Sequence, residues 1–165
     1  MRSSLKSQYH AGLAMLRSAI SQCPEVAWND AGHANRFWHV AYHVLFYTDF
    51  YLHPDVDSFT PWDGHRKDLN YMGMAPGQPP RPVEPGEPLT RERLLDYWRV
   101  VDGRVDPAVD ALDLGAPESG FWWYRMSKLE HLLVNLRHLQ HHTGQLVERV
   151  RGAGGDPVAW VGGTG

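Results

Sequence analysis

Hydrophobic positions recur at helical spacing in several long stretches of the chain. Between residues 3 and 22 they recur every three or four positions, with polar side chains between them. These positions are Leu5, Tyr9, Leu13, Leu16 and Ile20. This pattern predicts an amphipathic core helix, not a signal peptide, and the Cys23-Pro24 step ends it. Residues 35–52 are apolar nearly all round and hold no Gly or Pro, which predicts a central helix instead of a pair of strands.

The second half of the chain predicts two more helices. One has Thr90 as its N-cap and buries the set Leu94, Leu95, Trp98, Val101, Val105 and Val109. We expect Gly103 and Pro107 to kink this helix or to end its regular part. The other covers 127–151, because Ser127 and Glu130 form a capping box and glycines follow Arg151. With no convincing strand, the prediction is an all-α four-helix bundle.

A proline-rich segment separates the second and third predicted helices. Residues 53–89 hold eight prolines, which forbid a long regular element. The segment is long enough to cross the length of a bundle, so the helices that flank it could run in the same direction. Its larger apolar side chains predict that it packs against the helices, and these are Phe59, Trp62, Tyr71, Met72 and Met74.

Composition narrows the class of protein. A length of 165 residues predicts one domain over residues 1–165. The net charge of −3 gives no electrostatic reason to expect nucleic acid as a partner. A single cysteine, Cys23, excludes an internal disulfide and a cysteine-based zinc site. No apolar run is long enough for a membrane span, so we expect no membrane partner and a cytoplasmic location.

The chemistry of interest lies on the last predicted helix. At about 100° per residue, its polar side chains form one stripe beside the leucines, and they are His131, Asn135, His138, His142 and Gln145. Polar groups in such a place must be hydrogen-bonded or hold a metal, because an unpaired buried polar group is costly. His141 points away from the stripe. Gly144, inside the helix, predicts the close approach of a neighbouring helix.

The spacing of the histidines is compatible with a metal site. His138 and His142 are one turn apart, which lets two imidazoles reach one ion. A third ligand has to come from another element, and residues 35–52 offer His39 or His43. His131 and Asn135 are candidates to orient a ligand ring by hydrogen bonding. The alternative is that all these histidines are hydrogen-bonded core or surface residues.

Aromatic residues surround the candidate site, and two interpretations of them remain open. They could line an apolar pocket over an ion or could simply belong to the core. The set consists of Trp38, Tyr42, Phe46, Tyr47, Trp122, Trp123 and Tyr124.

Residues 138–146, His-Leu-Gln-His-His-Thr-Gly-Gln-Leu, resemble the H-x-x-H-H-R-G-Q signature of the DinB/YfiT-like metalloenzymes. His43, followed by Tyr51-Leu52, resembles the first ligand segment of that family. The resemblance implies a four-helix bundle in up-down-down-up order and a triad of His43, His138 and His142 on a divalent metal, zinc or nickel. His39 could replace or assist His43. Thr143 stands where the family commonly has arginine.

The resemblance also implies a function. Family members with known activity are thiol-dependent transferases, in which a low-molecular-weight thiol is joined to an electrophile, and a hydrolytic member would use a metal-bound hydroxide. We therefore expect a metal-dependent transferase with a small-molecule substrate. The alternatives are a metal-dependent hydrolase, a non-catalytic metal-binding or stress-associated protein, and a structural protein with hydrogen-bonded histidines. A bundle of this kind is also expected to form a homodimer.

Overall fold

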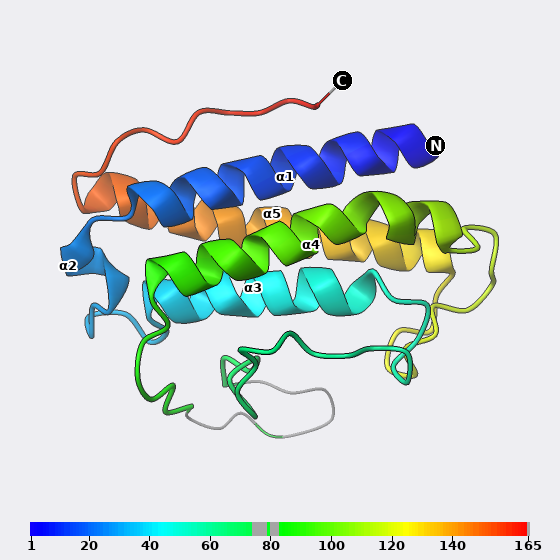
Figure 1. The fold of residues 1–165 in the computed structure, drawn as a ribbon, viewed down its shortest axis with the longest axis horizontal. Coiled ribbons are helices and arrows are strands. Elements are labelled where there is room, and N and C mark those ends of the chain that lie inside the picture. Colours follow the sequence, from blue (N-terminus) through cyan, green and yellow to red (C-terminus); the bar gives the residue numbers. More distant parts are fainter. Residues whose placement is uncertain (74–78, 80–82, 165) are drawn as a thin grey trace.

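The computed structural model describes residues 1–73, 79 and 83–164 and contains five helices (Figure 1). They are α1 (Arg2–Gln22), α2 (Glu25–Trp28), α3 (Phe37–Tyr51), α4 (Arg91–Ala111) and α5 (Lys128–Gly152). No strand occurs within these described ranges, which confirms the all-α prediction. Four helices were expected, and the additional one is α2, which forms a single turn after Pro24 and is too short to have a hydrophobic period.

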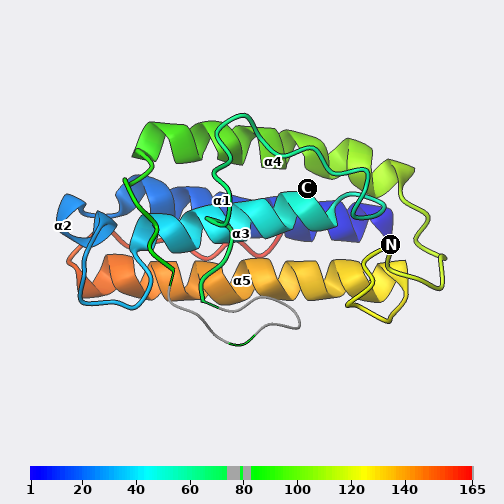
Figure 2. The same ribbon diagram turned by 90° about the horizontal axis from the view of Figure 1, so that it is seen from below.

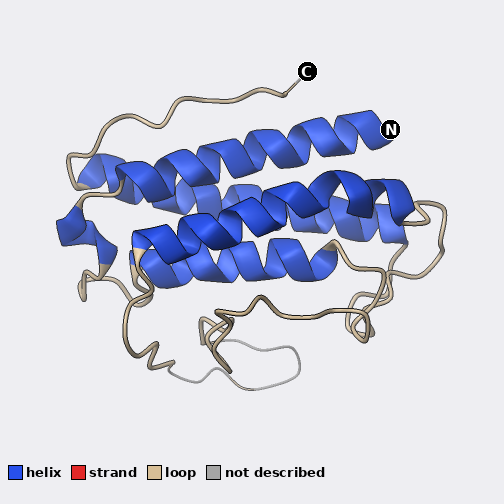
Figure 3. Cartoon of the chain, viewed as in Figure 1, coloured by secondary structure: helices blue, strands red, loops and turns tan. Residues whose placement is uncertain are grey.

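The four long helices lie side by side (Figures 1 and 2). In Figure 1, α1 and α5 end on the side of the molecule where α2 lies, and α3 and α4 begin there. Thus α3 and α4 run in the same direction, and the described parts of the connection between them are loop (Figure 3). Thr90 and Ser127 cap α4 and α5 as predicted, since their hydroxyl groups accept hydrogen bonds from the backbone N–H groups of Arg93 and Glu130.

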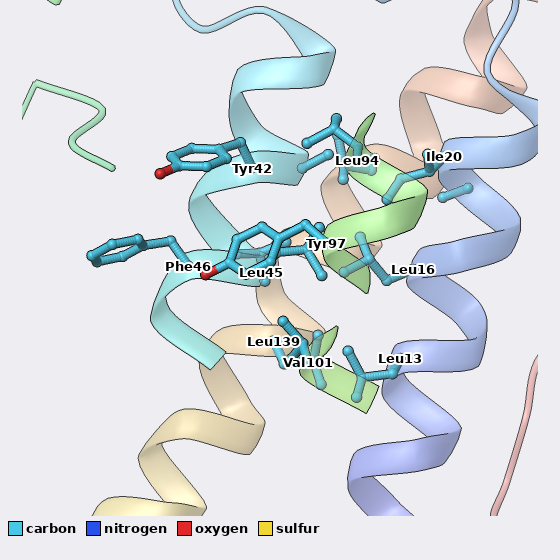
Figure 4. Close-up of a cluster of buried hydrophobic side chains, with 14 of the residues drawn as sticks. Leu13, Leu16, Ile20, Tyr42, Leu45, Phe46, Leu94, Tyr97, Val101 and Leu139 are labelled. Atoms are coloured by element: carbon cyan, nitrogen blue, oxygen red, sulfur yellow. The ribbon is translucent and has the colours of Figure 1, made fainter. Parts of the chain in front are cut away.

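The core lies where the four long helices meet. The predicted apolar face of α1 is buried along its whole length. In Figure 4, Leu13 and Leu16 of α1 lie beside Val101 of α4 and Leu139 of α5, and all four side chains are fully buried. Apolar burial of this kind is the main favourable contribution to folding. Among the described residues, no helix combines the length and the apolar character that crossing a membrane requires.

The prediction for Gly103 and Pro107 was wrong in one respect, because α4 does not end at either residue and continues to Ala111. Proline within a helix removes one N–H donor and crowds the carbonyl four residues before it, here that of Gly103. Both residues are exposed, so water can hydrate that carbonyl. On the opposite side, Val101, Val105 and Val109 are completely buried, and their packing holds the helix together.

The connection between α3 and α4 packs against the bundle in its described part. Phe59, Trp62 and Met72 contact the core, and the ring of Trp62 stacks on Tyr97 with centroids 4.7 Å apart. Tyr71 is half-buried. Met74, also predicted to pack, lies outside the described residues.

The close helix contact expected at Gly144 occurs elsewhere. A Cβ atom on Gly144 would meet nothing within 4 Å, so that prediction was wrong. Two helices do come close at Gly12 of α1, because a Cβ atom there would lie 2.8 Å from Leu139 Cδ2 of α5. The prediction rested on the cost of a glycine inside a helix, which does not by itself reveal where a neighbouring helix crosses.

Candidate metal centre

Three histidines from two helices meet at one point. His43 lies on α3, and His138 and His142 lie one turn apart on α5. One nitrogen atom from each ring can be chosen so that all three lie within 4.8 Å of one another. The Nε2 atoms of His43 and His138 are 3.0 Å apart, and the three ring centroids are separated by 4.6–5.0 Å. The three imidazoles are therefore close enough to share a small ion.

Hydrogen bonds from the Nδ1 atoms of His43 and His142 orient these two rings. His43 Nδ1 donates to the backbone carbonyl of Asn70 at 2.7 Å. His142 Nδ1 donates to Oε1 of Gln145 at 2.8 Å. A proton held on Nδ1 in this way leaves Nε2 as the lone-pair donor of the neutral ring, and this is the usual arrangement around histidine ligands.

Burial keeps the three rings neutral. It lowers the pKa of His43 well below its usual range, and the proximity of His138 adds to the effect. It also lowers the pKa of His138 to about 3, with a further contribution from His142. The pKa of His142 is lowered by burial as well, although the bond to Gln145 acts in the opposite direction. At neutral pH all three rings are in the form that can ligate a metal.

The donor set fits a divalent transition metal. Three neutral imidazole nitrogens suit zinc, nickel or copper better than magnesium or calcium, which prefer oxygen ligands. The buried His138 Nδ1 has no hydrogen-bond partner in the described structure. If His138 carries its proton on Nε2, it can donate to His43 Nε2 without any ion. The histidine geometry is therefore compatible both with a bound metal and with a hydrogen bond between two rings.

The other candidate residues lie outside this group. His39 is buried one turn before His43, and its Nε2 donates to the backbone carbonyl of Leu69 at 2.8 Å. This bond fastens the connection to α3 and directs His39 away from the cluster. His141 is exposed and accepts a hydrogen bond from Gln145 Nε2 at 3.1 Å.

His131 and Asn135 are fully buried, and in the described chain they contact groups other than the three rings. The ring of His131 packs against Tyr51, Phe121 and Tyr124, at centroid distances of 4.6–5.0 Å, and neither of its nitrogens has a hydrogen-bond partner among the described residues. Asn135 Nδ2 donates to the backbone carbonyl of Thr48 at 3.2 Å. In the described structure the hydrogen bonds to the ligand rings come from Asn70 and Gln145, and the orienting role expected of His131 and Asn135 stays a prediction.

Sequence reasoning assigned no role to Asn70 or Gln145. For Gln145 a signal existed, because it lies three residues after His142 on the same polar stripe. For Asn70 there was none, since its contribution is a backbone carbonyl on an irregular segment. Thr143, at the position where the resemblance has arginine, is completely buried. An arginine at this position would have to bury its guanidinium or displace its neighbours.

Comparison with known proteins agrees with this architecture. The family model described as the DinB superfamily matches residues 8–146, which include most of α1, all of α3 and α4, and the three histidines. No curated protein and no solved structure matches the chain. The family match covers most of the chain, and on this ground the protein belongs to the DinB superfamily.

Proposed function

We propose that the protein is a divalent-metal-dependent enzyme that joins a low-molecular-weight thiol to an electrophilic small molecule. The observation that supports this most is the convergence of His43, His138 and His142 with the Nδ1 atoms of His43 and His142 already hydrogen-bonded. Zinc or nickel is the metal we expect. Three protein ligands leave a position for a small molecule, as in catalytic metal sites and unlike closed structural ones.

A bound divalent ion would supply Lewis acidity, which lowers the pKa of a thiol. The chain contributes three neutral imidazoles, and Asn70 and Gln145 hold the orientation of two of them, His43 and His142. In the transfer, the thiol proton passes to solvent and a sulfur lone pair forms the new carbon–sulfur bond. The leaving group departs with the electron pair of the bond that breaks.

The first experiment tests the metal. Protein purified without a nickel column is analysed for bound metals, and zinc and nickel affinities are then measured. We expect one ion per chain and a large loss of affinity in His138→Ala. His141→Ala is the matched control, because His141 is a neighbouring exposed histidine on the same helix. Absence of metal binding at micromolar concentrations would reject the proposal in favour of hydrogen-bonded histidines.

The second experiment tests the reaction. Metal-loaded protein is incubated with a panel of low-molecular-weight thiols and electrophiles, and the consumption of thiol is followed. We expect turnover that is lost in His138→Ala and kept in His141→Ala. Metal binding without any thiol transfer would favour the non-catalytic metal-binding alternative. Ester or amide hydrolysis without thiol would favour the metal-dependent hydrolase.

Further expectations from the sequence belong to the same proposal. We propose the up-down-down-up order for the four long helices, and the directions visible in Figure 1 support it. We also propose that residues 1–165 form one domain, supported by a single core to which all four long helices contribute. Homodimerisation and a cytoplasmic location stay predictions, the first to be tested by light scattering of the purified protein.

A further inference from the structure

An aromatic pocket of about 450 Å³ lies between α3, the connection that follows it and the segment 121–124. Its apolar wall includes Phe46 and Phe50 of α3, Phe59 of the connection, and Trp123. Phe59 meets Phe50 at 62° and Phe46 at 81°, with ring centroids 4.7 and 5.3 Å apart. Edge-to-face packing of this kind fixes the positions of the rings, so the wall is formed before any ligand arrives.

The pocket and the three histidines share two residues. Tyr47 and Asn70 line the pocket. The ring of Tyr47 is also 4.8 Å from that of His43 and 5.6 Å from that of His138. Asn70 accepts the Nδ1 hydrogen bond of His43, and its side-chain amide donates to the Tyr47 hydroxyl at 3.4 Å. The pocket is therefore adjacent to the proposed metal ligands, and the hydrogen-bonded pair of Tyr47 and Asn70 lies at this shared boundary.

The described lining of the pocket includes no acidic, basic or histidine side chain. A charged group entering this lining would lose hydration without gaining a counter-ion. An uncharged aromatic group would instead exchange water for ring contacts.

We propose that this pocket binds an uncharged aromatic compound, with one hydrogen-bonding group of the ligand at Tyr47 and Asn70. Its assignment as the site of the electrophilic substrate rests on the proposed function. In that role, Phe46, Phe50 and Phe59 select the substrate by its ring, and Tyr47 is a positioning residue that directs the reacting carbon toward the side of His43.

The test uses 1-naphthol as probe and isothermal titration calorimetry as readout, with the complete chain in metal-free and zinc-loaded forms. We expect saturable binding to the metal-free protein. Naphthalene-1-sulfonate, which adds a charge, and cyclohexanol, which lacks the aromatic system, should each bind at least about tenfold more weakly. Binding of the anion as tightly as of naphthol would overturn the proposal.

Substitutions in the lining test whether 1-naphthol binds in this pocket. Val56 lines the pocket, and Val56→Trp should fill it and weaken 1-naphthol binding by about tenfold or more. The control is Val100→Trp, which adds the same side chain at an exposed position on α4. Val100 does not line the pocket, so this change should leave 1-naphthol binding unchanged. Circular dichroism verifies folding. If Val56→Trp does not fold, Phe59→Leu, which removes one ring of the wall, replaces it. Unchanged affinity in a folded pocket variant contradicts the proposal.

The two proposals fail in different ways. If the pocket variants lose 1-naphthol binding but keep their zinc affinity, the aromatic site is supported. This holds even if no thiol transfer is found. Thiol transfer to aromatic electrophiles at undiminished rates in the folded Val56→Trp variant would reject the pocket as the substrate site while leaving the proposed reaction intact.

Discussion

The Nε2 atoms of His43 and His138 face each other at 3.0 Å although the two residues are 95 positions apart in the chain. The bond from His43 Nδ1 to the Asn70 carbonyl places the proton of His43 on the far side of its ring. The nitrogen that faces His138 then carries a lone pair. Two nitrogens at this distance need either a proton or a cation between them, because two lone pairs repel each other. This requirement is the physical basis of the metal proposal.

Gln145 is expected to tune metal affinity without touching the metal. Its Oε1 accepts the Nδ1 hydrogen bond of His142, and loss of such a partner commonly weakens a metal site by about 10–100-fold. Gln145→Ala should therefore lower zinc affinity within this range, measured by competition with a chromophoric chelator. Gln145→Glu keeps an acceptor at the same place and should largely restore it. Equal affinities in the wild type and Gln145→Ala would show that this bond does not orient His142.

His131 is expected to make the protein less stable in acid. Burial lowers its pKa to about 4 in the folded chain, with an additional contribution from Lys128. The unfolded chain binds the proton below about pH 6.5, so the free energy of unfolding falls as the pH drops from 6.5 to 4. The loss from this group is on the order of 3 kcal/mol and is complete near the folded pKa.

His131→Phe should remove this contribution, because phenylalanine does not titrate and suits the surrounding rings of Tyr51, Phe121 and Tyr124. Urea unfolding at several pH values between 7 and 4 should give a weaker pH dependence for the variant. His33→Phe, at an exposed site, serves as control. Parallel pH profiles for the wild type and His131→Phe would contradict the prediction.

Arg104 is expected to stabilise the contact between α3 and α4. Its Nε lies 2.6 Å from Oδ1 of the buried Asp49, whose Oδ2 also accepts a hydrogen bond from Tyr97 at 3.1 Å. Burial raises the pKa of Asp49 even though Arg104 acts in the opposite direction. Arg104→Ala would leave a carboxylate in the core without its counter-ion, and should lower the free energy of unfolding by about 2–3 kcal/mol.

The matched control is Arg99→Ala on the same helix, since Arg99 pairs with Asp96 at the surface. Exposed ion pairs contribute little, so this change should stay within about 0.5 kcal/mol. Urea unfolding at neutral pH measures both variants. If Arg104→Ala and Arg99→Ala lowered the free energy of unfolding by similar amounts, the pair of Arg104 with Asp49 would behave as a surface ion pair.

Two helical glycines are expected to respond oppositely to alanine. Gly144→Ala should raise the free energy of unfolding by about 0.5–1 kcal/mol, because the added methyl group has open space and alanine favours the helix. Gly12→Ala should lower it by about 1 kcal/mol or more, since its Cβ would lie 2.8 Å from Leu139 Cδ2 and 2.9 Å from Gln140 Nε2. Thermal unfolding measures both, and stabilisation by Gly12→Ala would show that α1 and α5 can separate at no cost.

The sequence alone determined the four long helices and the candidate ligands on α5. Apolar repeats such as Leu5 to Ile20, and the caps Thr90 and Ser127, act within one or a few turns and can be recognised without any tertiary structure. For the same reason, the spacing of His138 and His142 was visible in the sequence. The turn α2 was missed because four residues have no period.

Helical spacing left both His39 and His43 open, the family resemblance favoured His43, and only the tertiary structure supplies the physical reason. Both lie on one face of α3, and the position of the connection decides between them: the Leu69 carbonyl accepts from His39 Nε2, whereas the Asn70 carbonyl accepts from His43 Nδ1 and leaves His43 Nε2 facing His138. The same packing separates Phe46 and Tyr47, which line the pocket, from Trp38 and Tyr42, which are fully buried in the core. Helical periodicity fixes the direction of a side chain around its own helix axis, but it carries no information about which distant backbone atom lies opposite.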